Sequence, residues 1–433
     1  MRLTARLALL TLGSAAIAAI WAQSAFTGNP PRPKPAFARQ TDAPKPGKAS
    51  PALNVETITN QLRSPFSMAF LPDGSFLVTE SAGTMRIVRR DGFVSSPIAG
   101  VPDVKSVGAQ GLHDVVLDPD FARNRTIYFN YFAPPGGEPA GMWPIEFFYD
   151  KVWAMSIAER RKSSIGMETA ASAKLSADGR RLEDVKTLVE GAERRMVIAP
   201  DGKLLITGSD RFFYYEKDYD GDEQDFVNDP DLPRNYSGRV LRINRDGSIP
   251  ADNPWLGRAT VPAATFAHGL RDPEGAAINP ATGDLWVTDH GPQGGDEINI
   301  IRSGKDYGWP NVSYGTQYDA RRTDGRKNVP VGSGKASMPG VEEPVYWWIP
   351  DIAPSGMMFY TGNLFPDWKG NLFVGGMEPK VLVRLVLDKN EVVAEERLLQ
   401  SVNQSPRDIR QGPDGAVYIL TRNGSLLRIS PRS

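Results

Sequence analysis

The sequence predicts an all-β protein, built as a six-bladed β-propeller with long loop insertions. Three observations support this prediction. A strand–turn–strand unit recurs six times along the chain, and three of its copies contain the same Pro-Asp-Gly turn. Glycine (42 residues) and proline (36 residues) are abundant, which favours many turns and short strands over long helices. Because the turn chemistry recurs together with the strands, a radial repeat explains the pattern better than a β-sandwich does.

The six copies share one layout, which predicts one blade for each copy. A short apolar strand leads into a turn and then into a second strand of alternating β-formers. In the turn, proline fixes φ and Asp-Gly tolerates positive φ, so the two strands pair in antiparallel fashion. The copies begin at Ser64 (SPFSMAFLPDGSFLVTE), Gly111 (GLHDVVLDPDF), Arg194 (RRMVIAPDGKLLITG), Asp272 (DPEGAAINPATGDLWVTD), Ala353 (APSGMMFYTGNLFPDWKGNLFVGG) and Ser405 (SPRDIRQGPDGAVYIL).

Uneven spacing of the copies predicts long insertions in some blades. The largest runs from Ala133 to about Ala173, and another begins at Tyr214. The second contains the acidic run DYDGDEQD, which starts at Asp218 and has the oxygen density of a calcium loop. An EF-hand requires glycine at the sixth position, where this chain has Glu223. We therefore interpret the run as a solvated acidic loop.

The N-terminal region differs in composition from the repeats. Residues 1–27 combine two early arginines with an apolar stretch and small residues, which predicts a signal peptide or, alternatively, an N-terminal membrane anchor. Residues 28–51 are rich in proline and lysine and lack periodicity, which predicts a disordered linker. The propeller is expected over residues 52–433. Such a leader predicts a periplasmic or secreted protein, in a compartment where calcium is available.

The composition excludes several kinds of site. The chain has no cysteine, so disulfides, thiolate metal sites, iron–sulfur clusters and thiol nucleophiles are absent. It has only three histidines, without the spacing of a zinc motif. The net charge is −1, from 50 basic and 51 acidic residues, which gives no indication of a nucleic-acid or membrane partner.

The stretch DHGPQGGDEINIIRSGKDYGWPN, from Asp289 to Asn311, predicts a cation site. Glycine and proline suit a loop that brings main-chain oxygens close to a ligand. The adjacent acids Asp296 and Glu297 add negative charge, and convergent carbonyls with carboxylates are what calcium prefers. The alternative is a solvated turn with an acidic tip.

With its repeats and loops together, the chain from about Val55 to Arg428 resembles the soluble pyrroloquinoline quinone (PQQ)-dependent sugar dehydrogenases, the glucose/sorbosone or aldose sugar dehydrogenase family. Four segments carry the resemblance, in order. They are GRVLRINRDGSIPADNP, GLRDPEGAAINPATGDLWVTDHGPQGGDEINIIRSGKDYGWPNV, APSGMMFYTGNLFPDWKGNLFVG and RDIRQGPDGAVYIL. The resemblance implies PQQ- and calcium-dependent oxidation of an aldose to its lactone. The partners would be a small sugar and an electron acceptor, and the protein a monomer or homodimer.

The resemblance also implies particular site residues. Main-chain carbonyls of Gly291 and Pro292 would bind the calcium that grips the quinone, and Glu297 and Tyr307 match a second, structural calcium site. Arg271 and Arg407 match positions that contact the cofactor, a tricarboxylate for which forked guanidinium donors are suited. Either arginine could instead pair with the aspartate that follows it. The family positions also match Asp272 and, one place out of register, Gln110.

One family residue is missing from this chain. Family enzymes remove the sugar's hydroxyl proton with a histidine, and the matching position is Gly191. Glu193 could take over if burial raised its pKa, so we assign Arg271 and Glu193 as candidate catalytic residues. His113, in the second repeat, is interpreted as a structural residue. A family arginine is also replaced by Ser405.

Two functions therefore compete at this stage. One is a dehydrogenase with a rearranged base. The other is a non-catalytic, calcium-stabilised propeller that binds a sugar or a protein partner. A calcium-dependent lactonase would require a cage of side-chain carboxylates, whereas this chain places its predicted cation against main-chain carbonyls.

Overall fold

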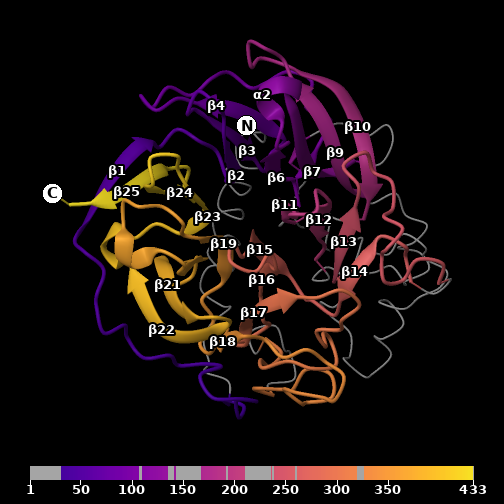
Figure 1. Ribbon diagram of the computed structural model, residues 1–433, viewed down its shortest axis with the longest axis vertical. Helices are drawn as coiled ribbons and strands as arrows, with labels where there is room; N and C mark the ends of the chain where they lie inside the picture. The colour runs from indigo at the N-terminus through magenta and orange to yellow at the C-terminus, as the bar shows by residue number, and fades with distance from the viewer. Residues whose placement is uncertain are drawn as a thin grey trace, which may run out of the picture.

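The computed structural model describes residues 31–106, 110–134, 141–142, 167–191, 194–209, 236, 238–258, 261–318 and 326–432. Six antiparallel sheets are arranged radially around one central axis (Figure 1). The prediction of a six-bladed β-propeller is confirmed. The predicted leader and the acidic run that starts at Asp218 lie outside the described residues, as does most of the largest insertion. Within the described part, no helix is long and apolar enough to cross a membrane.

The first three blades follow one another along the chain. Blade 1 has three strands and blades 2 and 3 have four each, with a short helix α2 (Phe121–Asn124) inside blade 2. Their strands are β2 (Pro65–Phe70), β3 (Phe76–Glu80) and β4 (Thr84–Val88); β6 (Leu112–Leu117), β7 (Thr126–Ala133), β9 (Met167–Leu175) and β10 (Leu182–Glu190); and β11 (Met196–Ile198), β12 (Leu204–Thr207), β13 (Arg239–Ile243) and β14 (Thr265–His268). A separate parallel pair joins β5 (Lys105–Ser106) to β8 (Gly141–Met142).

The last three blades are each four-stranded, and blade 6 closes the ring. Its outermost strand comes from the start of the fold, because β1 pairs antiparallel with β25. Blade 5 has two short 3-10 helices: η2 (Pro366–Trp368) lies between its first and second strands, and η3 (Gln400–Val402) follows its last strand. The strands are β15 (Pro273–Ile278), β16 (Leu285–Asp289), β17 (Asp296–Ile301) and β18 (Tyr346–Trp348); β19 (Pro354–Phe359), β20 (Leu372–Gly376), β21 (Val381–Asp388) and β22 (Glu391–Leu398); and β23 (Pro406–Gln411), β24 (Val417–Thr421), β25 (Leu426–Pro431) and β1 (Leu53–Thr59).

The Pro-Asp-Gly turns have the predicted chemistry. In blade 1, the amide of Gly74 donates to the Leu71 carbonyl (2.8 Å), and Gly74 has a φ of 82°. The carboxylate of Asp73 accepts from the Ser75 amide (2.9 Å) and fixes the corner. The turns of blades 3 and 6 repeat the pattern. Each turn connects the innermost strand to the next, so the three turns share one end of the propeller.

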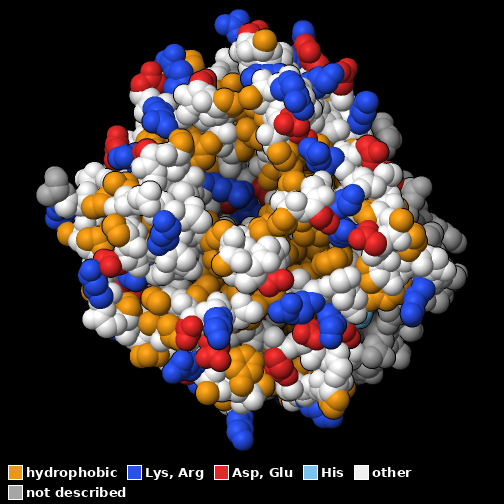
Figure 2. Space-filling view, in the orientation of Figure 1, with side chains coloured by type: hydrophobic (Ala, Val, Ile, Leu, Met, Phe, Trp, Pro, Cys, Tyr) orange, Lys and Arg blue, Asp and Glu red, His pale blue; other side chains and the backbone are white. Residues whose placement is uncertain are grey.

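The six innermost strands form the wall of the channel. They contact one another in the closed order β2, β6, β11, β15, β19 and β23. All six begin at the same end, which we call the mouth, and the Pro-Asp-Gly turns mark the opposite end. Basic side chains are visible deep in the central hollow of the face drawn in Figure 2. The wall is therefore charged, in contrast to the apolar cores between the blades.

One guanidinium ties several of these strands together. Arg195, directly before β11, is 2% exposed. Its Nε donates to the carbonyl of Glu274 in β15 (2.7 Å), and its Nη2 donates to the carbonyl of Arg407 in β23 (3.0 Å). Its Nη1 forms ion pairs with Asp408 in β23 (3.2 Å) and Asp114 in β6 (3.6 Å). Four blades therefore meet at one side chain.

The segment before the propeller differs from its prediction. Residues 31–51 have no regular secondary structure, yet they are not a free linker, because they lie along the outer edges of blades 4 and 5 before entering β1 (Figure 1). The amide of Trp347 donates to the Gln40 carbonyl (2.9 Å), and the amide of Glu395 donates to the Pro44 carbonyl (2.9 Å). These bonds satisfy edge-strand amides that composition alone could not reveal. We call residues 31–51 the belt.

The Arg195 contacts predict a large effect on stability. We expect Arg195→Met to lower the free energy of unfolding by about 3–5 kcal/mol, because the change leaves buried carboxylates without one of their cations. Urea unfolding followed by fluorescence measures the loss. Arg181→Met is the control, because the ion pair of Arg181 with Glu183 is exposed (64% and 43%) and contributes little to stability. Equal effects of the two substitutions would contradict the central role of Arg195.

Candidate functional site

Two adjacent main-chain carbonyls converge on one cationic group at the mouth. Arg271, between β14 and β15, is 6% exposed. Its Nη1 donates to the carbonyls of His290 (2.9 Å) and Gly291 (2.8 Å), and its main-chain amide donates to the carboxylate of Asp289 (2.8 Å). Two main-chain carbonyls thus face a guanidinium here, and the assignment of Gly291 and Pro292 to calcium stays a prediction.

The arginine does not pair with the aspartate that follows it. The Asp272 carboxylate, which is fully buried, lies 3.2 Å from Nε of Arg194 and accepts a hydrogen bond from the hydroxyl of Ser209 (2.7 Å). Asp272 therefore faces blade 3, whereas Arg271 faces the end of β16. The alternative in which Arg271 is neutralised by Asp272 is wrong.

Residues 291–295, which we call the carbonyl turn, fold back on themselves. A Cβ atom at Gly291 would lie 2.3 Å from the carbonyl oxygen of Gly294 and 2.5 Å from the carbonyl carbon of Gly295, so a larger residue does not fit. Gly294 and Gly295 have φ angles of 77° and 80°, in the left-handed region that favours glycine. The three glycines are therefore a steric requirement of this turn.

Two buried aspartates fasten the carbonyl turn to blade 5. One carboxylate oxygen of Asp296 accepts from the Gly291 amide (2.9 Å), and the other accepts from the amides of Ile352 (2.7 Å) and Ala353 (2.8 Å). Asp351 accepts from the Gly294 amide (2.6 Å). The turn is thus held by side chains from two blades.

Burial of these carboxyl groups raises their pKa values. The pKa is about 7 for Asp289 and for Asp351, and about 8 for Asp296, where the nearby Asp351 charge adds to the effect of burial. Burial, and to a lesser extent the charge of the nearby Asp289, raises the pKa of Glu297 to about 8. A divalent cation among these groups would favour their ionised forms. The donor chemistry therefore fits a hard cation such as calcium.

Side chains alone do not form a metal cage here. Among the described residues, no three histidine or acidic side chains converge in a way that could hold an ion. A cation at the mouth would therefore depend on main-chain oxygens, as the sequence predicted for Gly291 and Pro292.

The predicted pair for a second calcium is not assembled by its side chains. The hydroxyl of Tyr307 donates to the carbonyl of Ile300 (2.6 Å) and accepts from the Arg302 amide (2.8 Å), at the far end of β17. Glu297 lies at the mouth end of the same strand and contacts the amide nitrogen of Asn299 (3.0 Å). The two side chains have separate partners, and the assignment of this pair to a second calcium stays a prediction.

A second arginine lies at the mouth, from blade 6. The guanidinium of Arg407 lies 2.8 Å from the carboxylate of Glu274 and 3.9 Å above the ring of Phe66. Burial lowers the pKa of Arg407 to about 10, so it stays charged at neutral pH. Burial opposes ionisation of Glu274, but the guanidiniums of Arg407 and Arg194 lower its pKa to about 2. Arg407 therefore pairs across the channel, and its predicted alternative partner Asp408 binds Arg195 and Arg410 instead.

A buried polar atom supports a ligand site on the other side of the mouth. Gln110, just before β6, is 4% exposed, and its side-chain oxygen makes no hydrogen bond. A buried acceptor without a donor costs about 1–3 kcal/mol, and such atoms often mark a bound ligand or water. Gln110 therefore remains a candidate cofactor contact.

The proton acceptor is the least complete part of the site. Gly191 directly follows β10, and its amide donates to the Glu168 carbonyl (2.6 Å), but Glu193 lies outside the described residues. His113 is 1% exposed, with its ring 4.5 Å from that of Phe66, in keeping with a structural residue. Asp351 is occupied by the carbonyl turn.

Sequence reasoning missed His290. It is only partly buried, and its Nε2 lies 2.5 Å from the Pro354 carbonyl, which requires Nε2 to be the protonated nitrogen. The signal was available, because His290 directly precedes the Gly-Pro pair. Its ring ties the end of β16 to the start of β19.

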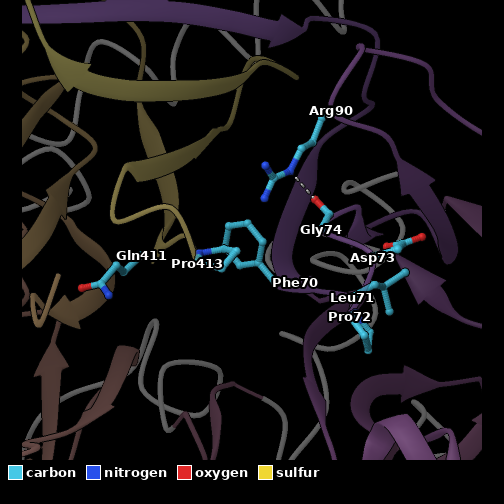
Figure 3. Close-up of a pocket in the computed structure, with 8 residues that line it drawn as sticks. All are labelled: Phe70, Leu71, Pro72, Asp73, Gly74, Arg90, Gln411 and Pro413. Atoms are coloured by element: carbon cyan, nitrogen blue, oxygen red, sulfur yellow. Dashed lines mark hydrogen bonds between the residues drawn. The ribbon is translucent and has the colours of Figure 1, made fainter. Parts of the chain in front are cut away.

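One hollow in the described part lies away from these residues. A hollow of about 560 Å³ opens between blades 1 and 6 at the Pro-Asp-Gly end (Figure 3). Phe70 and Pro413 meet across it, and Arg90 donates to the Gly74 carbonyl (3.1 Å) at its edge. It is lined by turn residues and shares no residue with the mouth.

Comparisons with known proteins agree with the fold and show the family. The family model for glucose/sorbosone dehydrogenase matches residues 62–428. Aldose sugar dehydrogenase YliI of Escherichia coli is 33% identical over 389 residues, which cover 89% of this chain and 95% of that protein. Quinoprotein glucose dehydrogenase B of Acinetobacter calcoaceticus is 27% identical over 84% of both chains. The apo crystal structure of the soluble E. coli aldose sugar dehydrogenase superposes with a TM-score of 0.72, at 31% identity, covering 88% of this chain and 100% of that one.

The carbonyl turn predicts an intolerance of side chains. We expect Gly291→Ala to lower the free energy of unfolding by about 1–3 kcal/mol, because its Cβ would meet main-chain atoms that cannot move away without breaking the turn. Thermal unfolding measures the change. Gly47→Ala in the belt is the control, since a Cβ there meets nothing within 4 Å. If Gly291→Ala unfolds like the wild type, the turn is looser than the contacts imply.

Proposed function

The chain belongs to the glucose/sorbosone dehydrogenase family, and from this premise we propose that it oxidises an aldose sugar to its lactone with PQQ and calcium. The observation that carries the proposal is the convergence of the His290 and Gly291 carbonyls at the channel mouth, beside buried carboxyl groups. Buried carboxyl groups with raised pKa values are more typical of functional sites than of purely structural cores.

The residues present fit an anionic quinone. Arg271 and Arg407 approach the mouth from blades 4 and 6, and Gln110 offers an unpaired buried acceptor from the second blade. Guanidinium groups bind carboxylates through two parallel hydrogen bonds, which orients a planar ligand as well as holding it. When bound, PQQ would accept the hydride that leaves the sugar.

Calcium and the cofactor would be coupled through Arg271. Its Nη1 already contacts the Gly291 carbonyl that calcium would bind, so a cation there would compete with the guanidinium. A displaced guanidinium is then available to a carboxylate of the cofactor. By linkage, each ligand would strengthen binding of the other by the same factor.

The chain must still supply a base for the sugar's hydroxyl proton. Glycine at position 191 has no side chain, and we propose Glu193, two residues further on, as the acceptor. A general base contributes about 10²–10⁴ to the rate, so a poorly placed carboxylate would still allow slow turnover. Asp351 and His113 are less suited, because the first holds the carbonyl turn and the second is buried.

A second function is favoured by one observation. Asp272 and Glu274 pair with Arg194 and Arg407, so part of the positive charge that a tricarboxylate needs is already neutralised. Together with the missing histidine, this favours a propeller that has lost the oxidation activity and binds a sugar or a protein partner.

We also propose a periplasmic or secreted location from the predicted leader. The electron acceptor is a further partner of the dehydrogenase.

Ligand binding tests the first function directly. With calcium present, we expect PQQ to titrate the protein with a saturable change in absorbance. Arg271→Ala should weaken this binding by about 1.5–3 kcal/mol, the value of a hydrogen bond to a charged group. Arg302→Ala is the control, because Arg302 lies at the other end of β17 and is half exposed. No PQQ binding by the wild type would favour the scaffold.

Chelation of calcium should lower the melting temperature of the protein, because a ligand that binds only the native state stabilises it and its removal takes that stabilisation away.

Turnover tests the base. With PQQ and calcium bound, we expect Glu193→Gln to reduce aldose-dependent dye reduction by about 10²–10⁴ while leaving PQQ binding intact. Gly191→His should raise turnover above that of the wild type, because imidazole is a stronger base near neutral pH. Equal turnover of wild type and Glu193→Gln, well above background, would exclude Glu193. If both are inert while Gly191→His is active, the chain is a binding scaffold.

A further inference from the structure

The belt is anchored by one buried glutamine. Gln40 is 0% exposed, although its neighbours on both sides are partly or fully exposed. Its side-chain oxygen accepts from the Ala36 amide (2.8 Å), and its side-chain nitrogen donates to the Pro344 carbonyl (2.9 Å). Its main-chain carbonyl accepts from the Trp347 amide in β18 (2.9 Å). A flexible linker would not bury an amide in this way, since each buried polar atom requires a partner.

Gln40 also reaches the loop that supports the carbonyl turn. The hydroxyl of Tyr314 lies 3.2 Å from the Gln40 side-chain oxygen and donates to the carboxylate of Glu343 (2.6 Å), which the Gln40 side-chain nitrogen also approaches (3.5 Å). The ring of Tyr314 stacks on Trp347 with centroids 4.9 Å apart. Tyr314 leads directly into Gly315, where a Cβ atom would lie 2.0 Å from the Gly294 carbonyl oxygen. The belt therefore holds a residue whose chain neighbour packs against the carbonyl turn.

The next residue of this loop pairs with the carbonyl turn itself. The amide of Gln293 donates to the Thr316 carbonyl (2.9 Å), and the amide of Thr316 donates to the Gln293 carbonyl (3.0 Å). A continuous path thus runs from Gln40 through Tyr314 to the turn at the mouth. A second contact connects the belt to the same region of the site: Arg32 donates to the carbonyl of Ile349, two residues before Asp351.

The other end of the belt is anchored elsewhere. The hydroxyl of Ser50 donates to Glu396 (2.6 Å) and accepts from Trp368 (2.9 Å) and Arg384 (3.0 Å), all in blade 5. These contacts do not involve the mouth. The belt therefore has two separate anchors, of which only the first is connected to the candidate site.

We propose that the belt is a positioning element for the candidate site, and that Gln40 holds the carbonyl turn in order through Tyr314 and Trp347. The belt acts from outside blade 4, opposite the channel, so it supports the turn without contacting any ligand. The proposal concerns the same site as the proposed function, but it rests on contacts within the chain and is tested without cofactor or substrate.

Hydrogen exchange of the full chain tests the proposal. Gln40→Met keeps the side-chain length and removes its hydrogen bonds. We expect amides in peptides covering 291–296 and 314–317 to exchange about five- to tenfold faster, the effect of losing about one hydrogen bond. Peptides from β24 and β25, in blade 6, should be unchanged. Tyr314→Phe removes one hydroxyl and should accelerate the same peptides by a smaller factor.

Two belt substitutions serve as matched controls. Lys45→Ala removes an exposed side chain and should change no peptide. Ser50→Ala should accelerate peptides from η2 and β22 while the carbonyl turn stays protected. The proposal is overturned if Gln40→Met leaves the turn peptides unchanged, or if it accelerates β24 and β25 equally, since uniform acceleration indicates a general loss of stability. A protein that is inactive with PQQ can still give the expected result, so the two failures are distinguishable.

Discussion

The guanidinium of Arg195 is the contact on which the centre of this propeller depends. A propeller leaves a channel where its innermost strands meet, and this chain fills part of that channel with charge. One buried cation binds two carboxylates and two main-chain carbonyls from neighbouring blades. A buried charge is costly unless its partners satisfy it fully, so the blades must come together in one arrangement.

The candidate site is a consequence of that arrangement. Arg195 binds the main chain at Glu274 and at Arg407, and these two residues form an ion pair with each other across the mouth. The centre of the channel thus sets the position of the groups above it. The position of the carbonyl turn is fixed from outside the channel, by the carboxylates of Asp296 and Asp351 and, we propose, by the belt. A ligand at the mouth would meet groups that are fixed from both sides, which reduces the entropy lost on binding.

The sequence predicted the fold well because its signals are local. A Pro-Asp-Gly turn needs only its own residues, since proline fixes φ, aspartate accepts from the amide two residues later, and glycine takes the positive φ. The carbonyl turn was predictable for the same reason. The contacts between blades across the channel could not be predicted from the sequence. Arg271 and Asp272 are adjacent in the chain, but successive side chains at a strand end face opposite sides, so they bind different blades.

The belt is a second case in which the sequence alone could not show which part of the protein a segment contacts. A segment rich in proline and lysine, without periodicity, indicates disorder when it has nothing to pack against. That inference assumes that no other part of the protein offers the segment a surface. Here two outer strands offer unpaired edges to the main chain of the belt, and the side chains of Gln40 and Ser50 add further anchors. Proline then becomes an advantage, because a segment with restricted φ loses less entropy when it docks. The composition that predicts a linker is also suited to an extended strap, and only the partner surface distinguishes the two.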